Sequence, residues 1–231
     1  VLDFGGQYTQ LIAKSVRKCN VFSEIIDCET SLDEIIEREP NGIILSGGPD
    51  SVYEEGAPTV DPNIFGINIP VLGICYGMQL TNHLLGGGML RAEDGQGEYG
   101  DTEVRLHVGN PLFNGIDRNI VARMSHGDSV DGLKLPEGFD EIAKTNLHVA
   151  GIANDEKKIY CVQFHPEVTH TQRGLDVVSN FVHEICGCGY EWTMANYIEE
   201  TKKYIRDTVG KNDVISFVSG GVDSSFVTAV L

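Results

Sequence analysis

The first part of the chain alternates short apolar runs with segments of helical periodicity. Apolar runs at Val1–Phe4, Val21–Ile26 and Gly42–Leu45 are typical of buried strands. Between them, Thr9–Arg17 has an amphipathic spacing, and Ser31–Glu37 begins with a serine that can cap a helix. Strands that alternate with helices favour a parallel sheet with helices on both faces. The pattern therefore predicts an α/β fold with a mostly parallel central sheet and flanking helices.

The next junction between a strand and a helix carries a candidate nucleophile. The apolar run Ile69–Leu72 leads into Gly73-Ile74-Cys75-Tyr76-Gly77, a Gly-x-nucleophile-x-Gly pattern, and a helix is expected through Leu85. The two glycines permit a tight elbow that holds Cys75 at a strained backbone angle with its sulfur exposed above the sheet. The helix N-terminus behind the sulfur favours the thiolate. A buried structural cysteine in a chance motif remains the alternative.

A pair of glycines follows the preceding strand. Gly47 and Gly48 come directly after Gly42–Leu45, at the edge where open α/β sheets bind their ligands. Adjacent glycines let backbone N–H groups face a ligand without side-chain hindrance. A Gly-Gly-Pro sequence in isolation is only a turn. Its position just before the Cys75 strand favours ligand binding.

The pattern changes beyond Gly86 to glycine-rich turns and alternating strands. The polar cluster Ser125-His126-Gly127-Asp128-Ser129 follows one of these strands. His126 is either a ligand-binding residue or a loop histidine, and the sequence alone favours the loop. The alternation predicts a smaller antiparallel sheet. Its strands are expected at Thr102–Leu106, Ile120–Met124 and Ile142–Lys144.

A histidine and a glutamate follow an expected hairpin. The hairpin strands are Val149–Ala153 and Ile159–Phe164, and the second runs into His165-Pro166-Glu167. Residues two apart in an extended segment share a face, and the proline keeps His165 extended. An imidazole beside its orienting carboxylate is the partner that a cysteine nucleophile needs. A surface histidine near a surface glutamate is the alternative, which the separate elbow at Cys75 makes weaker.

A domain boundary is expected near residue 189. The helical segment Leu175–Cys186 is broken by Gly187-Cys188-Gly189-Tyr190. We therefore expect one domain over residues 1–189 and the start of another over residues 190–231. The second begins with a charged helix over Met194–Val209 that ends at Gly210.

The last segment of the chain predicts the first βα unit of a second α/β domain. The apolar run Val214–Val218 is expected to be a strand, and the loop Ser219–Ser225 leads from it into an apolar helix. Glycine-rich loops between a strand and a helix bind phosphate through backbone N–H groups, the helix dipole and hydroxyls. The loop is not a Walker A motif, because no Gly-Lys-Ser/Thr follows.

Charge and cysteine usage narrow the functional classes. The net charge of −17 argues against nucleic acid or an anionic membrane as the main partner. No apolar stretch reaches membrane-spanning length, and no signal peptide is present, so we expect a cytoplasmic protein with reduced cysteines. Cys186-Gly187-Cys188 lacks a second ligand cluster, so no metal site is expected. The sequence begins inside an expected strand and stops inside an expected helix, which favours a fragment of a longer protein.

Three separated motifs resemble known enzyme families. Val71–Gln79 and Gln163–Glu167 are similar to the signature of the triad-type (class I) glutamine amidotransferases. Ser219–Ser224 resembles the pyrophosphate loop of the N-type ATP pyrophosphatases. The glutamine-hydrolysing GMP synthase family joins these modules in this order, and the chain resembles it over its whole length. Three further stretches are also similar to that family: Asp3–Gln10, Ser125–Asp128 and Val168–Thr171.

The resemblance implies the chemistry of the first domain. Cys75 would attack the side-chain amide of glutamine to form a γ-glutamyl thioester and release ammonia, and His165 and Glu167 would complete the triad. The N–H groups of Gly48 and Tyr76 would stabilise the oxyanion. No cofactor is expected in this domain. The implied oxyanion or substrate contacts are Gly47, Gly48, Tyr76, Gln79, Ser125, His126, Gly127 and Asp128.

The resemblance also implies the partners of the complete enzyme. ATP with Mg²⁺ would activate XMP for amination to GMP, and a homodimer would form through a C-terminal region outside this chain. XMP-binding residues would lie beyond Leu231, so the chain alone is not expected to make GMP. Gly97 stands where the family usually carries arginine, which puts a contact between the modules in doubt. The implied ATP-binding residues are Ser219, Gly220, Gly221, Val222, Asp223 and Ser224.

Three other functions stay open. A glutaminase module could serve another synthetase, such as one for anthranilate or carbamoyl phosphate, although the phosphate loop argues against it. A non-catalytic binding or regulatory module on the same fold should have lost Cys75, His165 or Glu167, and all three are present. A cysteine peptidase on this fold would keep the cysteine and histidine, but nothing in it predicts the attached phosphate loop.

Overall fold

The computed structural model describes residues 1–91 and 97–230, which form two compact units, Val1–Gly189 and Tyr190–Leu231. Residues 92–96, inside the glycine-rich stretch expected after Gly86, lie outside the described residues. So does Leu231, at the end of the expected second domain. Within the described parts of the chain, no helix has both the length and the apolar composition needed to cross a bilayer.

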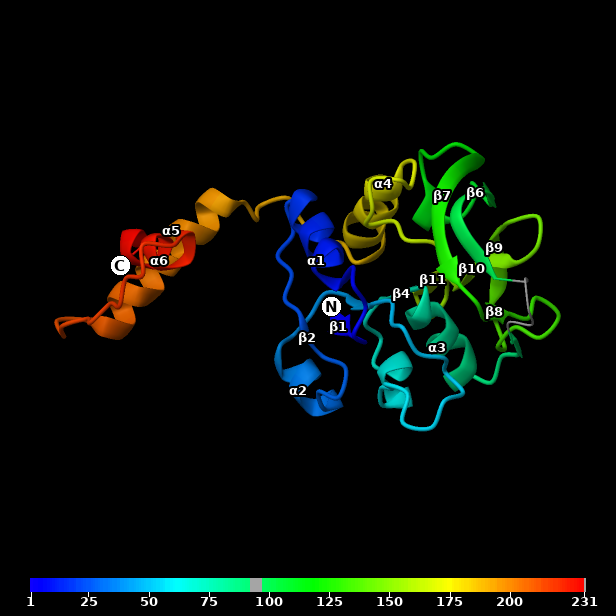
Figure 1. Cartoon of the computed structure of the whole chain (residues 1–231), viewed down its shortest axis with the longest axis horizontal. Helices are drawn as coiled ribbons and strands as arrows, with labels where there is room; N and C mark the ends of the chain where they lie inside the picture. The colour runs from blue at the N-terminus through cyan, green and yellow to red at the C-terminus, as the bar shows by residue number, and fades with distance from the viewer. Residues whose placement is uncertain (92–96, 231) are drawn as a thin grey trace. The chain divides into compact units, whose positions relative to one another are not determined.

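A nine-stranded mixed sheet forms the centre of the first unit (Figure 1), in the order β2-β1-β3-β4-β11-β10-β9-β6-β7. Neighbouring strands are parallel from β2 to β11 and antiparallel from β11 to β7. The parallel strands are β1 (Leu2–Asp3), β2 (Ile26–Asp27), β3 (Ile43–Leu45), β4 (Val71–Ile74) and β11 (Ile159–Val162). The others are β6 (Glu98–Leu106), β7 (Asn119–His126), β9 (Asp140–Lys144) and β10 (Val149–Asn154).

The predicted α/β class is confirmed. The expected antiparallel strands differ from the prediction in the sheet to which they belong. β6, β7 and β9 extend the central sheet, because β9 pairs with β10 and β6 with β9. A separate antiparallel sheet exists as well, and it consists of the short strands β5 (Met89–Leu90) and β8 (Ser129–Val130). The hairpin of β10 and β11 forms as expected.

Successive residues of the central strands enter two different cores. Leu72 and Ile74 of β4 belong to the core beneath α1 (Thr9–Lys18) and α4 (Gly174–Ser179), whereas Val71 belongs to the core beneath α3 (Tyr76–Leu84). Because side chains alternate across a strand, the apolar run is buried on both faces. The two helix layers are visible in Figure 1, with α1 and α4 on one side of the sheet and α3 on the other. The remaining helical segments of this unit are α2 (Leu32–Glu37), η1 (Pro62–Gly66), η2 (Pro111–Phe113) and η3 (Asn180–Ile185).

The expected strand Val21–Ile26 is mostly wrong. Only Ile26–Asp27 pairs with β1. Ser23 forms hydrogen bonds with α1 instead. Its Oγ donates to Ala13 O at 2.9 Å, and its carbonyl accepts from Arg17 at 2.7 Å. These contacts satisfy the backbone locally and stop the segment from joining the sheet.

The helix predictions in both units hold. Ser31 Oγ accepts a hydrogen bond from Glu34 N at 3.3 Å, which caps α2 as expected. The helix expected over Leu175–Cys186 forms, but its second half, η3, is a π-helical turn in which Cys186 N donates to Phe181 O. In the second unit, α5 (Met194–Val209) ends at Gly210, whose φ is 59°.

The strand expected at Val214–Val218 is wrong. These residues have no regular structure between α5 and α6 (Val222–Val230), and Ile215 and Phe217 are 82% and 91% exposed. A strand forms only against a neighbour that accepts its hydrogen bonds. Among the described residues of the second unit there is no second strand, so the apolar sequence alone does not produce one.

Gly77 allows α3 to pack closely against β3, and its replacement should destabilise the first unit. A Cβ at this position would collide with Leu45 O and lie 2.7 Å from Leu45 Cβ. We expect Gly77→Ala to lower the free energy of unfolding by about 1–3 kcal/mol, measured by urea denaturation. Gly66→Ala is the control, because a Cβ there meets nothing within 4 Å. Equal stability of the two variants would show that the contact is not tight.

Candidate active site

Cys75 lies at a strained turn between β4 and α3. Its φ of 52° and ψ of −107° are unusual for a residue with a side chain. Backbone hydrogen bonds hold the turn on both sides, from Cys75 N to Val162 O at 2.8 Å and from Gly77 N to Ser46 O at 3.1 Å. A Cβ at Gly73 would lie 2.7 Å from Gly77 O, so only glycine allows this approach. The expected elbow is therefore present.

The sulfur of Cys75 is more enclosed than the sequence indicates. The residue is 5% exposed, so the expectation of an exposed sulfur is wrong, although the residue does line a cavity. Two segments from the far half of the chain cover it. Sγ lies 3.7 Å from Ser125 O at the end of β7 and accepts a hydrogen bond from Gln163 Nε2 at 3.5 Å.

His165 and Glu167 form a buried pair. His165 Nδ1 lies 2.8 Å from Glu167 Oε1, and their side chains are 7% and 0% exposed. The pairing was predicted from an extended backbone, and that reason is wrong: β11 ends at Val162 and the chain then bends and turns. Hydrogen bonds fix the turn instead, from His165 N to Arg123 O at 3.1 Å and from Thr171 Oγ1 to His165 O at 2.6 Å.

The surroundings of His165 favour its charged form. Burial lowers the pKa of the imidazole, but its hydrogen bonds to Cys75 and Glu167, together with their negative charges, outweigh burial and raise the pKa to about 10. At neutral pH the ring therefore carries a proton that it can give to a leaving group. Glu167 accepts from Nδ1, which leaves Nε2 as the nitrogen available for proton transfer.

A cavity of about 580 Å³ opens onto Cys75 and His165. Almost all residues expected to contact substrate line it, the exception being Tyr76. The Tyr76 ring packs on Phe4 with centroids 5.4 Å apart, and its hydroxyl donates to Pro58 O, so only its backbone can reach a ligand. The expected residues that line the cavity are Gly47, Gly48, Gln79, Ser125, His126, Gly127 and Asp128.

Comparison with known proteins identifies the family. Residues 1–185 match the family described as glutamine amidotransferase class-I, which covers almost all of the first unit. The chain belongs to the class-I glutamine amidotransferases. Cys75, His165 and Glu167, which the sequence predicted as a triad, lie within the matched residues.

One curated relative carries the name of a synthetase. "GMP synthase [glutamine-hydrolyzing]" of Caldicellulosiruptor saccharolyticus is 51% identical over the whole chain. The chain spans 44% of the length of that relative, so it matches less than half of the longer protein.

Two solved structures share the fold. A Thermoplasma acidophilum protein, provisionally named as one part of a GMP synthase, is 31% identical, with a TM-score of 0.70 over 87% of this chain and 95% of that chain. A Thermotoga maritima glutamine amidotransferase has a TM-score of 0.61 over 80% of this chain and 94% of that chain. Its identity is 20%, so it supports the fold alone.

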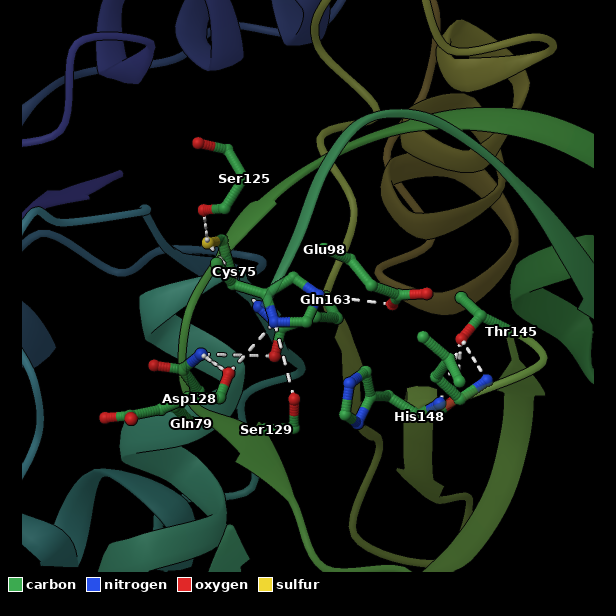
Figure 2. A network of polar contacts seen from close by, with 11 residues as sticks. Cys75, Gln79, Glu98, Ser125, Asp128, Ser129, Thr145, His148 and Gln163 are labelled. Carbon is green, nitrogen blue, oxygen red and sulfur yellow. Dashed lines mark hydrogen bonds and ion pairs between the residues drawn. The ribbon is translucent and has the colours of Figure 1, made fainter. Parts of the chain in front are cut away.

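A polar network joins the amidotransferase cavity to Cys75 (Figure 2). Gln79 Nε2 donates to Asp128 O at 2.9 Å and to Gln163 Oε1 at 3.2 Å, and Gln163 donates to the sulfur. His126 Nδ1 lies 3.0 Å from the same Asp128 oxygen. The expectation of a loop histidine is wrong, because His126 ends β7 and is 4% exposed. Burial lowers the pKa of His126, against the opposing effect of its carbonyl contact.

Several lining residues were not expected to contact the substrate. The loop Gly5–Tyr8 follows β1, and Pro49, Asp50 and Ser51 follow β3. Both segments leave carboxyl ends of parallel strands, so the rule that located Gly47 and Gly48 could have found them. Gln163 also follows a parallel strand, β11, but its contact with the Cys75 sulfur depends on how the chain bends after that strand.

The expected ATP loop belongs to the second unit. Ser219 Oγ and Ser224 Oγ lie 3.1 Å apart, and Ser224 Oγ accepts from Ser219 N at 3.2 Å. Gly220 has a φ of 81°, and α6 begins at Val222. Ser219–Asp223 are exposed and Ser224 is half-buried. Among the residues that the structure describes, no group of three or more histidine, cysteine or acidic side chains is arranged to hold a metal ion.

The pKa of His165 should fall when Glu167 loses its charge. Glu167→Gln keeps an oxygen that can accept from Nδ1 but removes one negative charge that raises the pKa to about 10. We expect the imidazole resonance of His165, assigned with His165→Asn, to titrate below about 10 in this variant by NMR. The exposed Glu184→Gln is the control and should leave the titration unchanged. An unaltered pKa in Glu167→Gln would contradict the assigned role of the carboxylate.

Proposed function

We propose that the chain is the glutaminase part of a glutamine-hydrolysing GMP synthase. The arrangement of Cys75, His165 and Glu167 at one cavity carries the proposal. The printed name of the curated relatives supports the choice of synthetase, and the Ser219–Ser224 loop supports a nucleotide-dependent partner reaction. Glutamine is the nitrogen donor in this proposal, and ammonia is the product that passes on.

The first half of the reaction forms a thioester. The thiolate of Cys75 attacks the side-chain amide carbon of glutamine, and the carbonyl electrons move to oxygen. The His165 imidazolium then gives its proton to the amide nitrogen as the carbon–nitrogen bond breaks, which releases ammonia. Glu167 holds the ring orientation and stabilises its charge.

The second half hydrolyses the thioester. Neutral His165 takes a proton from water, and the resulting hydroxide adds to the thioester carbon. Collapse of the second tetrahedral intermediate expels the Cys75 thiolate and leaves glutamate. The imidazolium and thiolate are then restored for another turnover.

Backbone amides near the elbow are suited to the oxyanion of both intermediates. Gly48 approaches so closely that a Cβ would lie 2.8 Å from Phe4 O and 3.3 Å from Tyr76 Cγ. Gly77 N is already bonded to Ser46 O, so Tyr76 supplies the first available amide of α3. One such donor typically stabilises the transition state by about 3 kcal/mol.

The loop Ser219–Ser224 fits a phosphate group. Gly220 has a positive φ, two serine hydroxyls meet at the loop, and the N-terminus of α6 follows. In our proposal this loop holds the ATP phosphates, and Asp223 is the nearby carboxylate for a phosphate-bound Mg²⁺. ATP would supply the activation of the XMP oxygen that ammonia replaces.

The remaining partners follow from the same proposal. XMP binding and homodimer contacts belong to the part of the longer relatives that this chain does not span. A cytoplasmic location agrees with six cysteines that are all free thiols.

Labelling with an electrophilic glutamine analogue tests the glutaminase step. We expect a diazoketone analogue to give one adduct on Cys75 by peptide mapping, and excess glutamine should block it. Cys75→Ala should take up no label and lose at least about 10³-fold of the ammonia release. Cys188→Ala is the control and should behave as the wild type. Labelling spread over several cysteines, or unaffected by glutamine, would favour a non-catalytic module.

Turnover by the full-length protein tests the choice of synthetase. We expect ATP and XMP together to raise ammonia release and to yield GMP, whereas the 231-residue chain alone should turn over glutamine slowly. Ser224→Ala in the full-length protein should lower ATP affinity about tenfold through loss of a hydroxyl donor to phosphate, without changing Cys75 labelling. A glutaminase indifferent to ATP and XMP would indicate a different synthetase.

A further inference from the structure

A second imidazole–carboxylate pair lies beside the cavity, formed by His126 and Glu98. The two residues are register partners on the antiparallel strands β6 and β7. His126 Nε2 lies 3.4 Å from Glu98 Oε2, and the side chains are 1% and 7% exposed. Glu98 does not line the cavity, whereas His126 does. Glu98 can therefore affect a ligand only through another residue.

The contacts of the His126 ring determine where its protons lie. Nδ1 faces Asp128 O at 3.0 Å, and because a carbonyl only accepts, Nδ1 must donate. On the other side, Nε2 faces Glu98 Oε2 at 3.4 Å, and neither of these buried atoms makes a hydrogen bond to any described residue. A proton shared by Nε2 and Oε2 would satisfy both atoms. With that proton the buried pair is neutral overall, which avoids an uncompensated charge.

The ring connects this proton to the cavity wall. Asp128 O accepts from His126 Nδ1 and also from Gln79 Nε2. The Asp128 carboxylate accepts from Ser51 Oγ at 2.6 Å. The wall made by residues 126–128 is thus held from three sides, and Gln79 continues the network through Gln163 to the sulfur of Cys75 (Figure 2).

The backbone before Glu98 packs against the same wall. A Cβ at Gly97 would lie 2.8 Å from His126 O and 3.2 Å from Gly127 Cα. The absence of a side chain at Gly97 therefore allows close contact with residues 126–127. This contact and the pairing of Glu98 with His126 across β6 and β7 place the Glu98 backbone beside the wall.

We propose that Glu98 is a positioning residue for glutamine, which acts by hydrogen bonding through His126 to fix the Asp128 carbonyl and the 126–128 wall. The inference rests on the proposed glutaminase function and deepens it. The role requires a proton between the two side chains, and does not require a negative charge on residue 98. An uncharged side chain that donates to Nε2 should therefore replace the glutamate.

Three variants of strand β6 separate this role from a merely structural one. Glu98→Ala removes the donor or acceptor for Nε2, Glu98→Gln supplies an amide N–H of similar reach, and Glu103→Ala removes an exposed carboxylate from the same strand. The probe is the diazoketone analogue of glutamine with the 231-residue chain. Its concentration dependence gives a half-saturation constant and a maximal labelling rate, and glutamine protection gives the dissociation constant of glutamine.

The expected effect is on binding and not on the reactivity of the bound state. Glu98→Ala should raise the glutamine dissociation constant and the half-saturation constant about tenfold, with the maximal labelling rate within about twofold of wild type. Glu98→Gln should restore both constants to within about threefold. Glu103→Ala should match the wild type.

Different results would contradict the positioning role of Glu98 and the proposed glutaminase function. If Glu98→Ala folds and glutamine protects its Cys75 as well as in the wild type, the positioning role is overturned. The role is also overturned if Glu98→Gln binds glutamine as weakly as Glu98→Ala does. If Glu98→Ala does not fold, Glu98→Asp provides the test: its shorter side chain should weaken glutamine binding, and wild-type binding would overturn the role. Failure of glutamine to protect Cys75 in the wild-type chain would overturn the proposed function and this inference together.

Discussion

The backbone of Cys75 is the constraint on which the site depends. A non-glycine residue at positive φ costs about 1–3 kcal/mol and persists only where neighbouring contacts fix it. Here Cys75 N donates to Val162 O in β11, and Gly77 N donates to Ser46 O directly after β3. Both strands lie parallel beside β4. Hydrogen bonds to the neighbouring strands therefore stabilise the strained backbone of Cys75. The same arrangement brings the chain after β11, and hence His165, next to the sulfur.

Two histidines beside one cavity show how the environment assigns chemical roles. His165 is hydrogen-bonded to Cys75 and Glu167, so its pKa rises despite burial. His126 is also buried, but burial dominates and its pKa falls. The first ring is suited to proton transfer, whereas the second is suited to a fixed hydrogen bond. Side-chain identity alone does not distinguish these roles, because both rings have a glutamate within 3.4 Å.

Local patterns predicted the elements whose causes are local. The Gly-x-Cys-x-Gly elbow, the Ser31 cap and the end of α5 at Gly210 depend on nearby residues, and all three were found from the sequence. Features set by distant contacts were missed. The Val214–Val218 run needs a partner strand, and the burial of His126 depends on Glu98 across the sheet. The His165–Glu167 pair was predicted correctly for an incorrect backbone reason.

The close glycine contacts make part of the cavity wall out of main chain. Gly47 and Gly48 line the cavity, and a Cβ at Gly48 would meet the backbone of Phe4. Few side chains can be added at this inner surface, because a Cβ there would disturb the walls. A change in substrate preference is more readily made at residues that line the cavity with a side chain, such as Asp50, Glu54 and Tyr99. An engineer who wishes to alter the nitrogen donor would begin at such positions.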